Sequence, residues 1–221
     1  MCGRFSQWSP PEVVAKEFGV YVPRLEPRYN VAPTQSAGVV RVSAEGGREF
    51  AALRWGLIPG WAKDPAIGNK LCNARAETVA EKPSFRDSLK GRRCVVPADG
   101  YYEWKREGAR KQPYYFRRRD GRPLAIAGLW DRWEGAGGEA AETFAVITTG
   151  ANDLAGAVHD RMPVVLSPDD YELWLGADAA DRGRLGELLR PCPGGVLEAY
   201  PVSARVNSPK NDDPELTEPL G

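Results

Sequence analysis

Short apolar runs separated by glycine-containing turns fill the middle of the chain, and this pattern constrains the fold more than any other feature. Successive strands are expected at residues 94–97, 101–106, 113–118, 124–133 and 143–149. Strands that are joined by short turns pair with their sequence neighbours, which produces antiparallel sheets. The pattern therefore favours a core built mainly from antiparallel strands.

The flanking segments add a few helices and further strands. Additional strands are expected at residues 39–42, 49–55, 164–166 and 196–202, and helices at residues 11–19, 84–90, 168–175 and 181–190. Ser9 is expected to cap the first helix and Gly19 to end it, while Ser167 caps the third. Residues 21–36 are expected to be extended, and residues 56–70 are expected to form an irregular loop. We predict one α+β domain over residues 1–205, with helices at its edges and a polar, proline-rich tail at 206–221.

Composition excludes several classes of protein. The 221 residues are 42% hydrophobic, which supports a real core. No apolar run approaches the roughly 18 residues of a membrane span, and no secretory signal is recognisable. The four cysteines form no CxxC pair and there is one histidine, so neither a zinc site nor another cofactor is expected. Separated thiols without an export signal indicate a reducing, cytoplasmic location.

The charge is balanced in total but unevenly distributed. Residues 82–132 hold 14 Lys and Arg against 6 Asp and Glu, and the same segment also contains Tyr101, Tyr102, Trp104, Tyr114, Tyr115 and Phe116. Such a segment is suited to following a phosphate backbone and stacking on bases. The alternative is a solvated sheet face with aromatic residues in the core.

Cys2 is the first candidate for chemistry. Removal of Met1, which is favoured when the next side chain is small, would leave an α-amine and a thiol on adjacent carbons. The α-amine has a reference pKa of about 7.7–8.0, so much of it is neutral and nucleophilic near neutral pH. An aldehyde can condense with the amine to give a Schiff base, which the thiol then closes to a five-membered thiazolidine. The alternative is that a cysteine stands at this position by chance.

Three further segments carry candidate polar side chains. Asn73 and Arg75 would share one face of an extended segment, where they can contact a hydroxyl, an amine or a phosphate. Glu103 is flanked by aromatic residues, and the resulting desolvation suits a carboxyl group to acid–base work. His159 is the single histidine of the chain and belongs to the residue type best suited to proton transfer, and Arg161 two residues later can bind phosphate. Each has a plainer alternative: a surface ion pair, an exposed strand residue or a structural turn.

The motifs that contain these residues occur together and in order. They read MCGRF at residues 1–5, YNVAPT at 29–34, RWGLIPGWA at 54–62, NARAET at 73–78, RRCVVPADGYYEW at 92–104 and HDRMPV at 159–164. Together they resemble the SRAP (SOS response-associated peptidase) family, and the segment VNSPKND at 206–212 also fits its C-terminal pattern. The resemblance covers almost the whole chain.

The resemblance implies a fold, a partner and a reaction. It implies a single domain with a curved, barrel-like β-core, a monomer that binds single-stranded DNA containing abasic sites, including junctions at stalled forks, and no membrane contact. Cys2, after Met1 removal, would form a covalent thiazolidine crosslink that protects the lesion. The implied catalytic residues are Cys2, Asn73, Glu103 and His159. The implied DNA-binding residues are Arg4, Arg75, Arg161, Trp61 and Trp104.

Two other functions remain open at this point. Cys2 could act as the nucleophile of an autopeptidase or amidase, as the family name suggests, with the α-amine as base and Asn73 as oxyanion partner. The chain could instead be a non-covalent reader of modified DNA bases, for which Cys2 would be dispensable. Peptidase, hydrolase or lyase-like chemistry is therefore part of the expectation.

Overall fold

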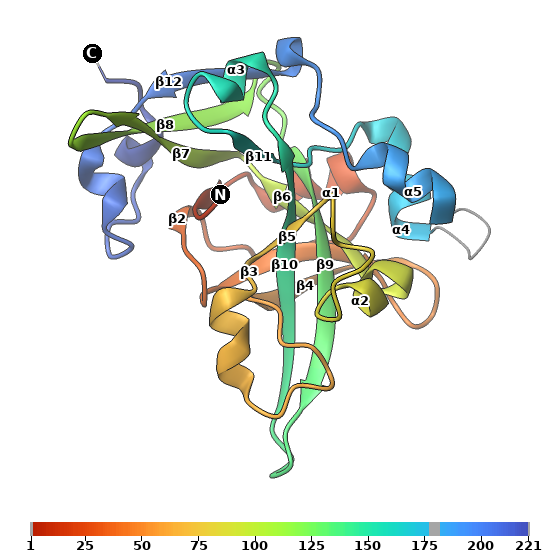
Figure 1. Ribbon diagram of the computed structural model, residues 1–221. Coiled ribbons are helices and arrows are strands. Elements are labelled where there is room, and N and C mark those ends of the chain that lie inside the picture. Colours follow the sequence, from red (N-terminus) through yellow and green to blue (C-terminus); the bar gives the residue numbers. More distant parts are fainter. Residues whose placement is uncertain (1, 177–181, 221) are drawn as a thin grey trace.

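The computed structural model describes residues 2–176 and 182–220, and its centre is a closed five-stranded β-barrel (Figure 1). Around the ring the strands are β10 (Ala140–Gly150), β4 (Arg48–Trp55), β3 (Ser36–Val42), β6 (Arg93–Ala98) and β9 (Leu124–Glu134). The ring closes because β9 also pairs with β10. Only the contact between β10 and β4 is parallel in this ring. The predicted α+β class with a curved, mainly antiparallel core is confirmed.

A second sheet packs at one end of the barrel, at the top of Figure 1. Its strands follow the order β12 (Leu197–Pro201), β8 (Arg110–Arg118), β7 (Gly100–Glu107), β1 (Phe5–Gln7) and β2 (Arg28–Val31). Two short strands, β5 (Asn73–Arg75) and β11 (Arg161–Pro163), flank the C-terminal half of β10. This junction between the barrel and the second sheet gathers most of the candidate residues.

Side-chain alternation divides the apolar residues between two cores. Val39, Val96 and Phe144 belong to the core that also contains Cys2, whereas their neighbours Val40 and Ala145 belong to the core under the helices. Consecutive residues of a strand point to opposite faces, so one strand supplies both cores. The barrel is therefore apolar on the inside and also apolar where helices cover its outside.

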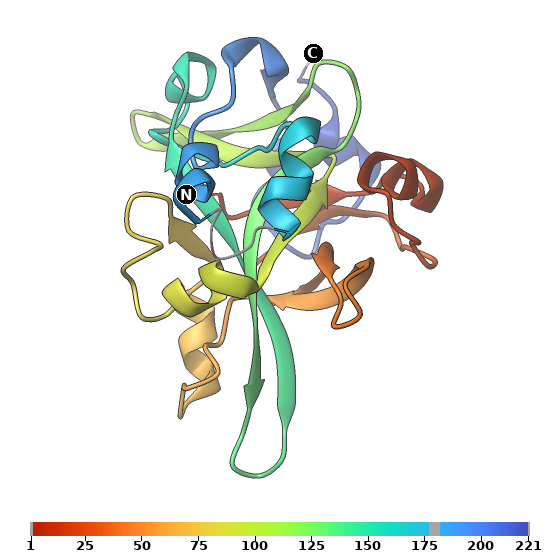
Figure 2. The same cartoon turned by 90° about the vertical axis from the view of Figure 1, so that its right-hand side faces the viewer.

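The helices are few, short and peripheral (Figure 2). They are α1 (Pro11–Phe18), α2 (Arg86–Gly91), α3 (Asp153–Gly156), α4 (Tyr171–Gly176) and α5 (Arg182–Leu188). Short 3-10 segments are η1 (Pro65–Lys70), η2 (Pro168–Asp170), η4 (Gly194–Val196), η5 (Ala204–Asn207) and η6 (Pro214–Thr217). Gly19 ends α1 as predicted, with a φ of 62° that few other residues adopt readily.

Three local predictions need correction. Ser9 does not cap α1, because its hydroxyl donates to the buried carboxylate of Asp99 instead. The strand expected at residues 164–166 lies earlier in the chain, as β11, and continues only through an isolated bridge at Val165. The segment 56–70, expected to be irregular throughout, contains η1, whose first turn is capped by Asp64.

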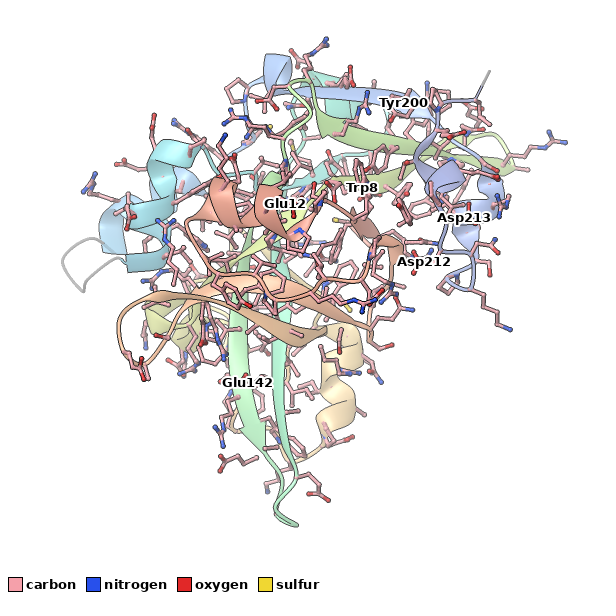
Figure 3. All side chains as sticks on the ribbon, turned by 180° about the vertical axis from the view of Figure 1, so that it is seen from behind. Trp8, Glu12, Glu142, Tyr200, Asp212 and Asp213 are labelled. Atoms are coloured by element: carbon pink, nitrogen blue, oxygen red, sulfur yellow. The ribbon has the colours of Figure 1, made fainter. Side chains whose placement is uncertain are left out.

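The C-terminal segment is held against the second sheet. Val206 and Leu216 are fully buried and pack with Tyr102 and Tyr115. Asp212, labelled with Asp213 in Figure 3, accepts hydrogen bonds from the backbone of β2, including one of 3.0 Å from the Asn30 amide. These contacts place residues 206–216 beside the N-terminal strands.

Candidate active site and nucleic-acid interface

The N-terminal segment is anchored by Phe5, which places Cys2 inside the protein. Phe5 is fully buried, pairs with Tyr101 of β7 and lies 5.0 Å from the Trp55 ring. The backbone amide of Tyr102 also donates to the carbonyl of Arg4 at 3.0 Å. Cys2 is consequently 0% exposed and joins the barrel core. Met1, whose removal the sequence predicts, lies outside the described residues.

Glu103 projects from β7 on the same side as Tyr101 and is also buried, at 3% exposure. Burial raises the pKa of Glu103, while the nearby charge of His159 acts in the opposite direction. Burial and the charge of Glu103 in turn raise the pKa of the Cys2 thiol far above its ordinary value. The thiol is therefore held as a neutral S–H next to a carboxyl group that protonates easily.

Strand β10 brings the remaining polar candidates to this place. Thr148 of β10 pairs with Arg75 of β5, and Gly150 pairs with Arg161 of β11. Asn73 stands at the start of β5, and its side-chain amide donates to the carbonyl of Cys2 at 2.9 Å. The structure thus joins Cys2 to segments that lie about 70 and 160 positions away in the chain.

The buried polar atoms without a hydrogen-bond partner in the described part of the chain include the side-chain oxygen of Asn73 and the hydroxyl of Tyr101, both in this cluster. A buried group without a partner costs about 1–3 kcal/mol, so such atoms are rare away from functional sites. Asn73 therefore offers an acceptor, and Tyr101 a donor, to a group that enters the site.

Tyr101→Phe is expected to stabilise the fold by about 1 kcal/mol, because the variant no longer buries an unsatisfied hydroxyl. Thermal unfolding should show a melting temperature higher by roughly 2–4 °C. Tyr115→Phe is the matched control, since its hydroxyl is bonded to Ser6 at 2.7 Å and its loss should destabilise. Equal destabilisation by both substitutions would show that the Tyr101 hydroxyl is satisfied in solution.

His159 lies in the turn before β11 and is held through its Nδ1 atom. The backbone amide of Arg161 donates to Nδ1 at 3.0 Å, and the exposed Asp160 carboxylate lies 2.9 Å from the same atom. A neutral ring accepts from the amide and carries its proton on Nε2, whereas a protonated ring pairs with Asp160. The Nδ1 atom therefore has a partner in either protonation state.

Arg161 is fixed by a bidentate ion pair. Its guanidinium lies 2.5 and 3.0 Å from the two carboxylate oxygens of Glu77 and also donates to the Thr148 carbonyl at 2.7 Å. The bond from Arg161 lowers the pKa of Glu77. Arg75, in contrast, is exposed and makes no ion pair or side-chain hydrogen bond within the described residues. Of the two, Arg75 is the more accessible to a phosphate.

Arg4 and Trp104, two of the predicted DNA contacts, are hydrogen-bonded within the protein. The Arg4 guanidinium donates hydrogen bonds to the Asn30 side chain, at 2.8 Å, and to the carbonyls of Val206 and Asn207. Arg4 therefore links the two ends of the chain. Trp104 points to the opposite face of β7 from Glu103 and donates to the Asn207 side chain at 2.7 Å. Their contacts to DNA stay predictions.

Trp61 lies apart from the cluster. It is 58% exposed, and the carbonyl of the next residue, Ala62, accepts a hydrogen bond from Trp133. Trp133 pairs with Ala141, near the start of β10, whereas Arg75 pairs with Thr148 near its end. At the usual strand rise the two places are roughly 20 Å apart. A DNA strand that touches both would have to run along the barrel.

Comparison with known proteins identifies the family. The family model described as SOS response associated peptidase (SRAP) matches residues 1–209. The chain belongs to the SRAP family. Cys2, strand β5 and the buried Glu103 described above all lie within the matched residues.

Several SRAP relatives carry names that state a function. The chain is 43% identical to the abasic site processing protein YoqW of Bacillus subtilis, over 99% of both chains, and 33% identical to the abasic site processing protein YedK of Escherichia coli, over 100% of both. It is 36% identical to the abasic site processing protein HMCES of Gallus gallus, covering 89% of this chain and 67% of that protein. A crystal structure of a Bacteroides thetaiotaomicron protein superposes with a TM-score of 0.87 at 32% identity, covering 99% of this chain and 100% of the other.

The structure also bears on metals and membranes. Among residues 2–176 and 182–220, no group of three or more His, Cys, Asp or Glu side chains is placed to hold a metal ion. Within the same residues, no helix has the length and apolar character needed to cross a membrane. All four cysteines are free thiols.

Proposed function

We propose that this protein binds single-stranded DNA at abasic sites and crosslinks to them through Cys2, shielding the lesion. The observation that carries the proposal is the convergence of Cys2, Asn73 and Glu103, which are buried or half-buried at the junction of the barrel and the second sheet. The names of the SRAP relatives support an abasic site as the substrate. Removal of Met1 would put the reactive amine on the residue whose thiol already lies there.

The first step opens the sugar. An abasic site is mostly a cyclic hemiacetal, which must open before its aldehyde can react. Neutral Glu103, favoured by its raised pKa, donates a proton to the ring oxygen as the carbon–oxygen bond breaks. His159 accepts the proton of the sugar hydroxyl. The products are an open aldehyde and a carboxylate beside the aminothiol.

The second step forms the crosslink. The α-amine of Cys2 adds to the aldehyde carbon, and water leaves to give a Schiff base, with Asn73 orienting the N-terminal residue through its bond to the Cys2 carbonyl. The thiol sulfur then bonds to the same carbon, and its proton passes to the nitrogen. The Cys2 thiol resists ionisation, so the Glu103 carboxylate relays this proton. One water is lost overall.

Three DNA strands of equal sequence test the proposal. One carries an abasic site, one carries a tetrahydrofuran analogue without an aldehyde, and one is intact. We expect a heat-stable adduct on denaturing gels with the first alone, and reversible binding to the second. Adducts with all three strands, or with none, would contradict the proposed chemistry.

A second experiment distinguishes the crosslinking proposal from the autopeptidase hypothesis. Unprocessed protein incubated without an aminopeptidase should keep Met1 if removal requires that enzyme, and should lose it if Cys2 cleaves its own chain. In the structure the Asn73 amide donates one of its two N–H groups to the Cys2 carbonyl, which leaves a single N–H of this amide for an oxyanion. This contact favours crosslinking over peptide hydrolysis.

A further inference from the structure

The outer half of the β7–β8 hairpin, residues 105–111, is strongly basic, and we call it the hairpin tip. It contains Lys105, Arg106, Arg110 and Lys111 against the single acid Glu107. Figure 1 shows the turn between β7 and β8 at the edge of the molecule, beside the C-terminal segment. Lys105 is half-buried and the other three cations are exposed.

The cations of the hairpin tip have no partners in the described part of the chain. None of the four makes an ion pair or a side-chain hydrogen bond there, whereas other surface arginines, such as Arg117 and Arg205, are paired with carboxylates. The protein thus neutralises much of its surface charge internally but leaves this cluster uncompensated.

The strand register makes the arrangement unfavourable without a ligand. Arg106 stands directly opposite Lys111 in the antiparallel pair. Side chains in such positions have Cβ atoms about 4.5–5.5 Å apart, and like charges there destabilise the sheet. The neighbouring Glu107 is opposite Arg110 and cannot lie on the same face as Arg106. An anion placed between Arg106 and Lys111 would relieve the repulsion.

The hairpin tip is continuous with the candidate active site. Lys105 follows Glu103 by two residues, so both project from the same face of β7 and lie about 7 Å apart along the strand. Arg106 and its partner Lys111 begin about 10 Å from Glu103 along the strand but project from the opposite face of the ribbon, the face of Trp104. A phosphate that flanks a sugar held at Glu103 would fall within reach of Lys105, and a strand that continues over the end of the hairpin would reach Arg106 and Lys111.

We propose that the hairpin tip binds backbone phosphates of the DNA strand that leaves the active site. This inference rests on the proposed function, because it places the lesion sugar at Glu103. On a narrow two-stranded ribbon, Lys binds phosphate through its single charge and Arg through bidentate hydrogen bonds. Neither contact depends on the edges of the bases. The contact therefore adds affinity that is independent of sequence and grows with the length of the strand.

The double substitution Arg106→Gln and Lys111→Gln tests the proposal on intact oligothymidylate. With a strand of about 16 nucleotides, the slope of log affinity against log salt should shrink by about 1 to 1.5. With a dinucleotide, which at about 3.4 Å per stacked nucleotide is too short to extend from Glu103 to Arg106 and Lys111, the two proteins should have the same slope. The double variant Lys16→Gln and Arg190→Gln removes the same charge from exposed positions elsewhere and should behave like the wild type.

The melting temperature of the double variant Arg106→Gln and Lys111→Gln shows whether weaker binding is caused by misfolding. Removing one like-charged pair should leave the melting temperature at low salt unchanged or higher, so weaker binding with a lower melting temperature would overturn the proposal. An unchanged salt slope on the long strand would also overturn it. Because intact DNA contains no aldehyde, this binding result is independent of crosslinking. If the salt slopes of wild type and double variant differ as expected but the wild type never crosslinks to abasic DNA, only the proposed function is refuted.

Discussion

Cys2→Ala is expected to abolish the heat-stable adduct with abasic DNA while leaving reversible binding close to that of the wild type. Alanine keeps the α-amine but lacks the sulfur that closes the ring, so only a Schiff base can form, and this hydrolyses when the protein unfolds. Cys2 is buried in the barrel core, and the smaller side chain leaves a cavity no larger than one sulfur atom. Denaturing gels after heating measure the loss directly.

Cys2→Ser separates the roles of nitrogen and sulfur. The serine amine can still form the imine, and borohydride should trap it, but the hydroxyl is a far weaker nucleophile than a thiol. The trapped adduct should therefore form at a substantial rate and the untrapped adduct should not survive heating. A heat-stable adduct with Cys2→Ser would show that ring closure by sulfur is not what makes the crosslink durable.

Glu103→Gln is expected to slow adduct formation by about 10²–10⁴-fold, because glutamine cannot donate or relay a proton. The defect should be smaller with a substrate whose aldehyde is already open, since ring opening is the step that needs the acid. Glu12→Gln, on the exposed outer surface of α1, is the matched control and should react at the wild-type rate. A single-turnover time course at saturating DNA measures the rate.

The same substitution has a predicted effect on stability with a definite sign. Burial raises the pKa of Glu103 in the folded protein, so the favourable neutral form is fully present below the unfolded value of about 4.3 and is lost as pH rises through the folded value. Glu103→Gln should therefore equal the wild type at acid pH and be at least as stable at neutral pH. Denaturant unfolding at several pH values tests this, and a variant that is less stable at neutral pH only would contradict it.

Local pattern predicted the longer strands but not how they close. The alternation of apolar residues between 94 and 149 located β6 to β10 to within a few residues. The parallel pairing of β10 with β4, which completes the barrel, joins residues such as Thr143 and Arg54 that lie far apart in the chain, and periodicity does not contain such a contact. Strands β1, β5 and β11 have three residues each and are too short to show a period.

The sequence predicted which residues form the candidate site, but not how the fold brings them together. The resemblance supplied Cys2, Asn73 and Glu103, whereas the pairing of β5 with β10 is what puts Asn73 against Cys2. Tyr101 was missed as a polar member of the site, although its spacing of two residues from Glu103 in a strand was a usable signal. The same alternation separates Trp104 from Glu103.

The most direct test of the account is the intact mass of the protein after reaction with an abasic oligonucleotide. We predict one species whose mass is that of the chain without Met1 plus that of the oligonucleotide, less one water, with the N-terminal peptide carrying the sugar. Efficient crosslinking by protein that still carries Met1, or a sugar attached to any residue other than Cys2, would contradict it.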